Sequence, residues 1–257
     1  MATVHDEKYY SIPKGKVLFR EDAQASWEDL GNCSKLEITE EIESVEHFSS
    51  RAGLKVRDQL VITSIKASGA LSLDSVHRDN LHKYFMADSD EDTTTTQTLA
   101  TDTTVTVAGV NLDRWHEIGK INLTNVVVKD STEVTTYVLG TDYVLDTKAG
   151  LIMPLSTGSI SEDDDIKVTY DNPAATIYHF LAASALTLRG HLYFVSDPGV
   201  GEIDDLKGYG SITPDGTYNA ISDEFVVIGL KCEFITHDDY SPGLMKVSYR
   251  GNVSAAS

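Results

Sequence analysis

Side chains that can bind metal ions gather at two places in this 257-residue sequence. Residues 88–92 place carboxylates at alternate positions, as a calcium loop does, but an EF-hand also needs Gly at its sixth position and a carboxylate at its twelfth. Those positions hold Thr93 and Leu99. Residues 237–239 read His-Asp-Asp, and adjacent side chains converge poorly on one ion. The sequence therefore predicts no metal site and no cofactor.

Motifs for phosphate binding and for covalent catalysis are also weak. The glycine-rich stretch 197–210 lacks the Gly-Lys-Ser/Thr of a phosphate loop and the strand–helix frame of a dinucleotide site, so we interpret it as a loop. No Gly-x-Ser-x-Gly elbow occurs, and Cys33 has no obvious partner histidine. We expect Cys33 and Cys232 to be reduced strand residues, although the sequence leaves their pairing open. These observations argue against an enzyme.

A cluster of basic residues is the most distinctive chemical feature of the chain. The stretch EHFSSRAGLKVRDQ, residues 46–59, carries Arg51, Lys55 and Arg57, whereas the whole chain has a formal net charge of -19. Such a cluster suits an anionic partner, which is a nucleic acid, a small phosphate or another copy of the same protein. The overall charge repels nucleic acids and anionic membranes. No uncharged apolar run approaches the roughly 18–20 residues of a membrane span, so we expect no membrane partner.

The elements around this basic stretch are predicted to be strands. In residues 35–44, Leu36 and Ile38 alternate with polar residues, which indicates one face on a core and one in water. Residues 58–67 form a second apolar-rich strand, and the two strands suit a hairpin with a long basic tip. Gly53 supplies conformational freedom for its turn.

The only helix we predict spans residues 71–85. Asp74 is its candidate N-cap, and an apolar face is formed by Val76, Leu81, Tyr84 and Phe85. The polar, Thr-rich stretch 86–104 then reads as a linker. Short strands with turn signals follow and suit a small antiparallel sandwich, which Asn172-Pro173 would end.

The order of segments resembles that of tailed-phage tail tube proteins. The N-terminal part of the resemblance is carried by IPKGKVLFRE, LGNCSKLEITEEIESVEHFSSRAGLKVRDQLV and LDSVHRDNLHKYFM. Three later segments resemble the closing strands of these proteins: GHLYFVSD, GSITPDGTYNAI and EFVVIGLKCEFITHD. The similarity covers residues 10–87 and about 180–240, and it rests on segment order because no single motif is diagnostic. Residues 92–173 are similar to immunoglobulin-like modules inserted in phage virion proteins.

This resemblance implies a mainly β fold in two domains. Residues 1–91 and 174–257 would form a discontinuous β-sandwich or barrel with one flanking α-helix, and residues 92–173 an inserted immunoglobulin-like sandwich. Such subunits form hexameric rings that stack into a tube in the virion tail, assembled in the host bacterial cytoplasm, and DNA passes through without specific binding. Tape-measure, tail-terminator and tail-tip proteins would be the other partners. The insert occupies the outer wall, which favours a long non-contractile tail, and it either binds surface glycans or is decoration.

The resemblance also assigns residues to surfaces of the tube. The loop that contacts the neighbouring ring would be Ser49, Ser50, Arg51, Gly53, Leu54, Lys55, Val56 and Arg57. The candidates for lining the lumen are Glu37, Thr39, Glu41 and Glu43. The alternatives are a solvated hairpin tip for the first group and an ordinary solvated strand face for the second.

Three other functions stay open on the sequence. The chain could be a tube protein of a contractile tail, or of a bacterial secretion apparatus with the same fold. A two-module carbohydrate-binding protein or acidic hydrolase is the third, and it predicts a stable monomer with a pocket of convergent polar groups.

Overall fold

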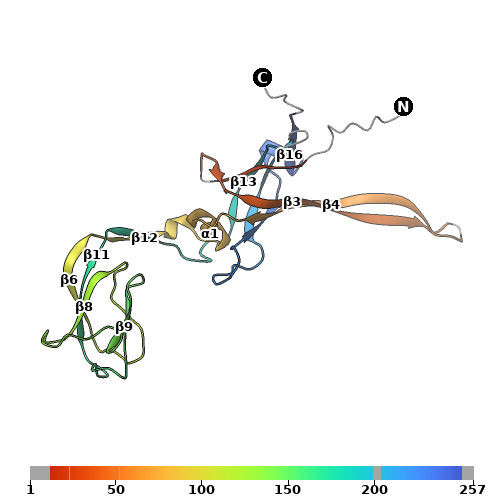
Figure 1. The fold of residues 1–257 in the computed structure, drawn as a ribbon. Coiled ribbons are helices and arrows are strands. Elements are labelled where there is room, and N and C mark those ends of the chain that lie inside the picture. Colours follow the sequence, from red (N-terminus) through yellow and green to blue (C-terminus); the bar gives the residue numbers. More distant parts are fainter. Residues whose placement is uncertain (1–11, 23, 52, 199–203, 251–257) are drawn as a thin grey trace, which may run out of the picture. The chain divides into compact units, whose positions relative to one another are not determined.

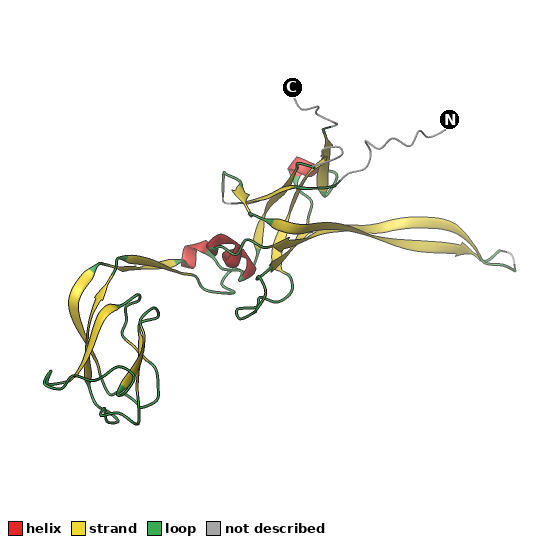
Figure 2. Ribbon diagram, in the orientation of Figure 1, coloured by secondary structure: helices red, strands yellow, loops and turns green. Residues whose placement is uncertain are grey.

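The computed structural model describes residues 12–22, 24–51, 53–198 and 204–250. Their fold is mainly β, as predicted, with several antiparallel sheets, a single α-helix and no closed barrel among these residues (Figures 1 and 2). The chain divides into two compact units, of which the first contains Met1–Glu91 and Phe180–Ser257 and the second contains Asp92–His179.

One antiparallel sheet of eight strands forms the first unit. Seven of its strands lie in the order β2 (Glu28–Asp29), β1 (Gly15–Glu21), β13 (Leu188–Ser196), β14 (Asp204–Pro214), β15 (Ile228–Phe234), β4 (Val56–Leu73) and β3 (Cys33–Ser49). The eighth, β16 (Met245–Tyr249), pairs with β14. The 3-10 turns of this unit are η2 (Ser89–Glu91) and η3 (Asp238–Tyr240).

The core of the first unit lies where its central strands alternate between buried and less buried residues. The fully buried side chains include Val17, Phe19, Leu71, Leu73, Leu192, Ile212, Ile228 and Leu230. Leu36 and Ile38 pack against this cluster while Glu37 and Thr39 are exposed, so the predicted two-faced strand is confirmed. Cys33 and Cys232 are both free thiols in this unit.

The helix is shorter than the sequence predicts. It is α1, Arg78–Tyr84, and residues 71–73 instead complete β4, because Leu71 and Leu73 alternate into the core. The N-cap is His77 rather than Asp74. The Asp74 carboxylate accepts hydrogen bonds from the side chains of Asn32 and Ser34, which fastens the end of β4 to the start of β3.

Buried polar contacts fix α1 on the sheet. Lys83 Nζ lies 2.6 Å from Glu28 Oε2, and the lysine side chain is almost fully buried. Asn80 donates hydrogen bonds from Nδ2 to the carbonyl oxygens of Leu30 and Ser75. Tyr84 and Leu81 pack against the core, whereas Val76, predicted on the same apolar face, is 39% exposed because it precedes the helix.

Two three-stranded sheets surround one core in the second unit. The first has the order β6 (Ala100–Val107), β11 (Ile166–Asn172), β8 (Thr124–Asp130), and the second β7 (His116–Glu117), β10 (Leu151–Pro154), β9 (Tyr143–Asp146). The shared core contains Val110, Val128, Ile152, Ile166 and Val168. Gly140 and Gly150 have φ values of 80° and 70°, which favour glycine, at two of the turns between these strands.

The boundaries of the second unit differ from the expected ones. It extends to His179 rather than residue 173, because β12 (Ala175–His179) pairs with β5 (Thr93–Gln97) in a two-stranded sheet. The prediction of a linker over 86–104 is therefore wrong for most of its length. The buried Gln97 side chain ties this sheet to the sandwich through Ile121 and the carbonyl of Pro173.

A second predicted loop is also partly a strand. Residues 204–210 of the glycine-rich stretch 197–210 belong to β14, and residues 199–203 lie outside the described part of the chain. Gly210 faces the Glu233 carbonyl of β15, where a Cβ would lie 2.4 Å from the oxygen. Gly210 therefore allows the two strands to pack closely and is not part of a phosphate loop. Among the described residues, no helix is long and apolar enough to cross a membrane.

Candidate functional site

The strands β3 and β4 continue beyond the sheet as a two-stranded ribbon. Ala67–Leu73 of β4 pairs with β15 on one side and β3 on the other, whereas residues 56–66 pair with β3 alone. We call residues 41–66, less residue 52, the distal ribbon (Figure 1). At about 3.3 Å per residue, its paired strands run for roughly 30 Å.

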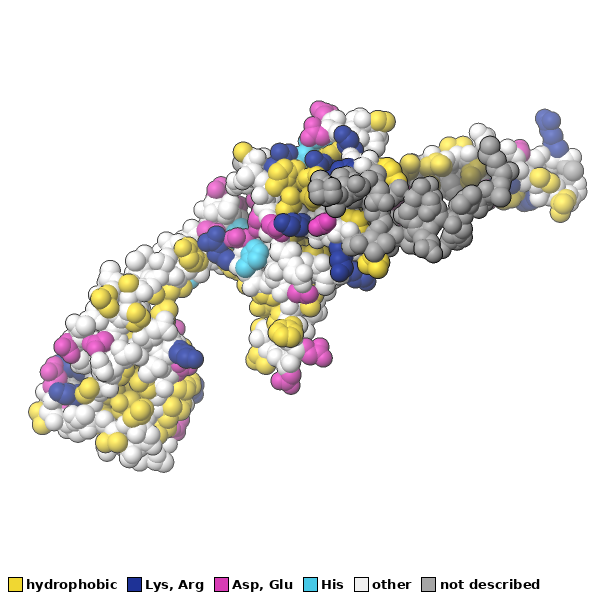
Figure 3. Space-filling model, turned by 45° about the horizontal axis from the view of Figure 1, so that its top comes forward, with side chains coloured by type: hydrophobic (Ala, Val, Ile, Leu, Met, Phe, Trp, Pro, Cys, Tyr) yellow, Lys and Arg dark blue, Asp and Glu magenta, His cyan; other side chains and the backbone are white. Residues whose placement is uncertain are grey.

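The distal ribbon exposes a set of large apolar side chains. These are Ile42, Val45, Phe48, Leu54, Val56, Leu60, Val61, Ile62 and Ile65, each between 45% and 76% exposed. Two pairs lie directly opposite each other across the ribbon, Ile42 with Ile65 and Val45 with Val61. Figure 3 shows hydrophobic side chains along the part of the ribbon that this view leaves uncovered. This surface has the composition of a buried strand, but no element of the described residues covers it.

Polar side chains pair across the ribbon between its apolar residues. Ion pairs join Arg57 to Glu46 at 2.5 Å and Lys66 to Glu43 at 2.7 Å, and His47 Nδ1 lies 2.6 Å from Asp58 Oδ1. The hydrogen bond and charge of Glu43 raise the pKa of Lys66 above its ordinary value. All six side chains are substantially exposed, and solvent screens such surface pairs, so each contributes little to stability.

The loop at the tip of the ribbon is shorter than the predicted one. β3 ends at Ser49 and β4 begins at Val56, so the prediction of a hairpin is confirmed with a connection over residues 50–55. Arg57 is a strand residue paired within the subunit, whereas no carboxylate of the described residues pairs with Arg51 or Lys55. A Cβ added at Gly53 would meet no atom within 4 Å.

The four candidates for lining the lumen lie on one side of β3. They stand at alternate positions, are all exposed and precede the register irregularity after Glu43; they are Glu37, Thr39, Glu41 and Glu43. Lysines lie on the same side: Lys35 contacts Glu37 at 2.9 Å, and Lys66 contacts Glu43. The surface is therefore a mixture of both charges in the subunit, not the uniformly acidic strip that their spacing suggests.

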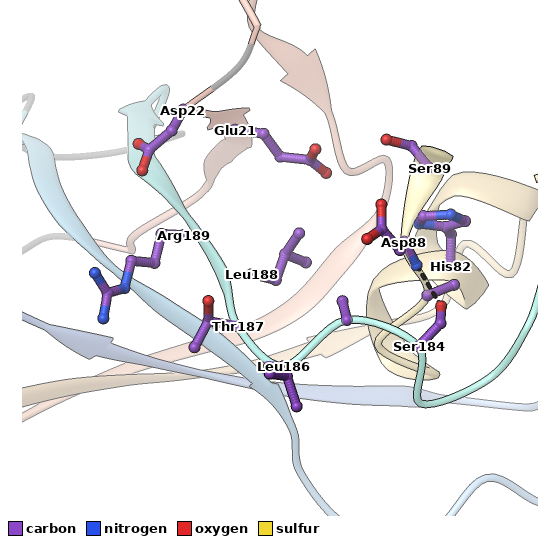
Figure 4. Close-up of a pocket in the computed structure, with 12 residues that line it drawn as sticks. Glu21, Asp22, His82, Asp88, Ser89, Ser184, Leu186, Thr187, Leu188 and Arg189 are labelled. Carbon is purple, nitrogen blue, oxygen red and sulfur yellow. Dashed lines mark hydrogen bonds between the residues drawn. The ribbon is translucent and has the colours of Figure 1, made fainter. Parts of the chain in front are cut away.

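A cavity of about 490 Å³ opens beside β1 and the start of β13 in the first unit. Figure 4 shows Glu21, Asp22 and Arg189 on one side of it and Asp88 with Ser184 on the other. The backbone N–H of Asp88 donates to Ser184 Oγ at 2.7 Å, and Asp22 accepts from the Tyr209 hydroxyl at 2.6 Å. These contacts engage Ser184 and Asp22 in holding the local fold.

Spacing arguments missed two features of the site. The apolar residues at 60–62 read as part of a core strand, because a sequence pattern records alternation and hydrophobicity but not what covers them. His191 of β13 lies beside His237, with ring centroids 4.8 Å apart, although 45 residues separate them in the chain. Only the pairing of β13, β14 and β15 brings these histidines together.

Residues 10–192 match the model of the family described as Protein of unknown function UCP028589. The chain belongs to this family. The matched region contains the whole distal ribbon, α1 and the second unit. A search of curated proteins found no match to the chain.

Proposed function

We propose that this protein is a structural subunit that assembles with copies of itself through the distal ribbon. The proposed assembly is the tube of a phage tail, in which hexameric rings stack around a channel for DNA. The observation that carries the proposal is the run of exposed apolar side chains on a ribbon that no other described strand or helix covers. Hydrophobic surface of this kind marks an interaction site on a soluble protein.

The backbone of the ribbon supports the same conclusion. A two-stranded hairpin is at best marginally stable in water. In the described part of the chain, no further strand pairs with the outer edge of residues 56–66 or with that of the β3 residues opposite them, so both edges present unpaired N–H and C=O groups. Soluble proteins protect such edges by short strands, prolines or bulges. This ribbon is long and contains no proline, and its two register irregularities, after Glu43 and after His47, interrupt the edges only locally. Contact with other copies would supply both a covering layer and further strand partners.

The charges at the tip suit a neighbouring copy of an acidic protein. Arg51 and Lys55 are exposed beside Leu54, which is 76% exposed. The chain carries 40 acidic residues against 21 Lys and Arg, so another subunit offers abundant carboxylates. We infer that Arg51 and Lys55 orient stacked rings through such pairs, since charged contacts at interfaces govern register more than affinity. The same negative charge keeps DNA from binding the channel wall.

The proposed tube also implies where the second unit lies and which other proteins contact the assembly. The second unit lies on its outer wall, and the tail is long and non-contractile. Tape-measure, tail-terminator and tail-tip proteins contact its ends, and the mature location is the virion. A tube in a contractile tail or in a secretion apparatus is the alternative that shares the same subunit contacts.

Negative-stain microscopy of the purified protein tests this function. Hollow rings or tubes at raised protein concentration are expected. Particles that remain monomeric across concentration and salt would contradict self-assembly and favour a two-module binding protein. A contracted sheath around the tube in virions would contradict the non-contractile tail while leaving the tube itself intact.

A further inference from the structure

Three side chains of the first unit stand close enough to share one metal ion. They are His191 in the middle of β13, His237 directly before η3, and Asp239 within η3. One ligand atom from each lies within 4.8 Å of the others. We propose that these residues form a site for a divalent transition metal, with Zn²⁺ as the expected ion, in the family of His₂-carboxylate centres.

The three ligand atoms need to move only slightly closer together to coordinate one ion. Ligand atoms at about 2.0–2.2 Å from a tetrahedral Zn²⁺ are roughly 3.3 Å apart. His237 Nδ1 is already 3.6 Å from Asp239 Oδ2. His191 sits on a rigid strand, whereas His237 is half-buried and Asp239 is exposed on a 3-10 turn, so rotation of the last two side chains supplies the movement.

One nitrogen of His191 has a hydrogen-bond partner, the hydroxyl of Tyr240. His191 Nδ1 lies 3.0 Å from the Tyr240 hydroxyl. If Nδ1–H donates to this oxygen, the lone pair of Nε2 is available to a metal, which is the arrangement that orients metal-binding histidines in proteins. His237 Nδ1 accepts a 3.2 Å hydrogen bond from the backbone N–H of Asp239, and the ion would replace this long contact.

Burial and nearby charges act on the His191 side chain. Burial, with smaller contributions from Arg20 and His237, lowers the pKa of His191 below its ordinary value. The carboxylates of Asp22 and Asp239 face the same group and offset the positive charge of Arg20.

An aromatic wall limits water on one side of the cluster. The Tyr209 ring is 4.5 Å from that of His237, and the Trp27 ring is 6.3 Å from that of His191. Three protein ligands leave one position of a tetrahedral ion for water or for a group of another molecule. A bound ion would tie β13 to the segment that follows β15 and stabilise the folded first unit by mass action.

Calorimetric titration of the tag-free full chain with ZnCl₂ tests the site, together with Co²⁺ as a spectroscopic substitute. The variants are His237→Asn, which keeps a side-chain oxygen for the N-cap of η3, and Asp239→Asn. Asp238→Asn is the matched control, because it removes the same charge from the adjacent position. Circular dichroism confirms the fold of each variant, and thermal unfolding is measured with and without Zn²⁺.

We expect one Zn²⁺ per chain, visible absorption of four-coordinate Co²⁺ and a rise in unfolding temperature with Zn²⁺. His237→Asn and Asp239→Asn should each weaken binding by about tenfold or more, and Asp238→Asn should leave it within twofold. Equal Zn²⁺ binding by all four proteins would overturn the site, since it would show a general attraction of the acidic surface. Absence of stoichiometric binding by the wild-type chain would overturn it equally.

Discussion

Replacing the facing isoleucines Ile42 and Ile65 by threonine should weaken self-assembly without unfolding the subunit. Threonine retains the β-branch that suits a strand, so the change removes apolar surface and little else. The two side chains are 60% and 57% exposed in the subunit. Substitutions at exposed positions usually change the free energy of unfolding by less than about 0.5 kcal/mol.

The effect on assembly follows from the surface that contact would cover. Full burial of an isoleucine side chain contributes about 1.5–3 kcal/mol, and a little over half of each side chain remains to be covered. Loss of most of this from both residues costs about 2 kcal/mol per subunit. Because 1.4 kcal/mol corresponds to a factor of ten, the critical concentration for assembly should rise about 30-fold.

Sedimentation of assembled material over a concentration series measures that critical concentration. The control is the double variant Val134→Thr with Val138→Thr, which removes exposed apolar surface from the second unit, where the two valines are 84% and 58% exposed. The control should assemble as the wild type does. If the isoleucine variant and the control have the same critical concentration, the distal ribbon is not the contact surface.

Three further predictions concern the tip, the second unit and the buried thiol. The double variant Arg51→Glu with Lys55→Glu should remain folded and fail to form tubes. The control variant Lys129→Glu with Lys148→Glu should form tubes. Normal tube growth by the Arg51 and Lys55 variant would show that the tip is only a solvated turn. The excised segment 92–179 should fold alone and be more stable to urea than 92–173, because the longer segment keeps β12 as the partner of β5; equal stability would show that this pairing contributes nothing. Burial raises the pKa of Cys232 to about 12, so at pH 8 a thiol reagent should label this residue only after unfolding, and rapid labelling of the native chain would contradict its burial.

Alternation was the sequence signal that predicted the fold best. In residues 35–44 the side-chain period of two separates Leu36 and Ile38 from Glu37 and Thr39, and this period follows from strand geometry alone. The same period of two continues through Leu71 and Leu73, which our prediction assigns to the helix because Asp74 is a candidate cap and the apolar residues that follow have helical spacing. The actual helix begins at Arg78, since the core takes residues 71–73 as a strand.

Features that depend on tertiary pairing could not be predicted. Thr93–Gln97 has no apolar alternation, and it is a strand because β12 provides its hydrogen-bonding partner. The exposure of Leu60 and Ile62 depends on where the sheet ends, which no local pattern records. The same holds for His191 and His237, whose proximity depends on the order of β13, β14 and β15.

Hydrogen–deuterium exchange of the free and the assembled protein tests most directly whether copies meet through the distal ribbon. Amide protection reports local stability and hydrogen bonding, and the paired but uncovered strands of residues 41–66 should exchange quickly in the free subunit. We predict strong protection of peptides from this ribbon on assembly, with little change in Thr124–Asp130 of the second unit. Assembled particles in which ribbon peptides exchange as fast as in the free subunit would contradict the account.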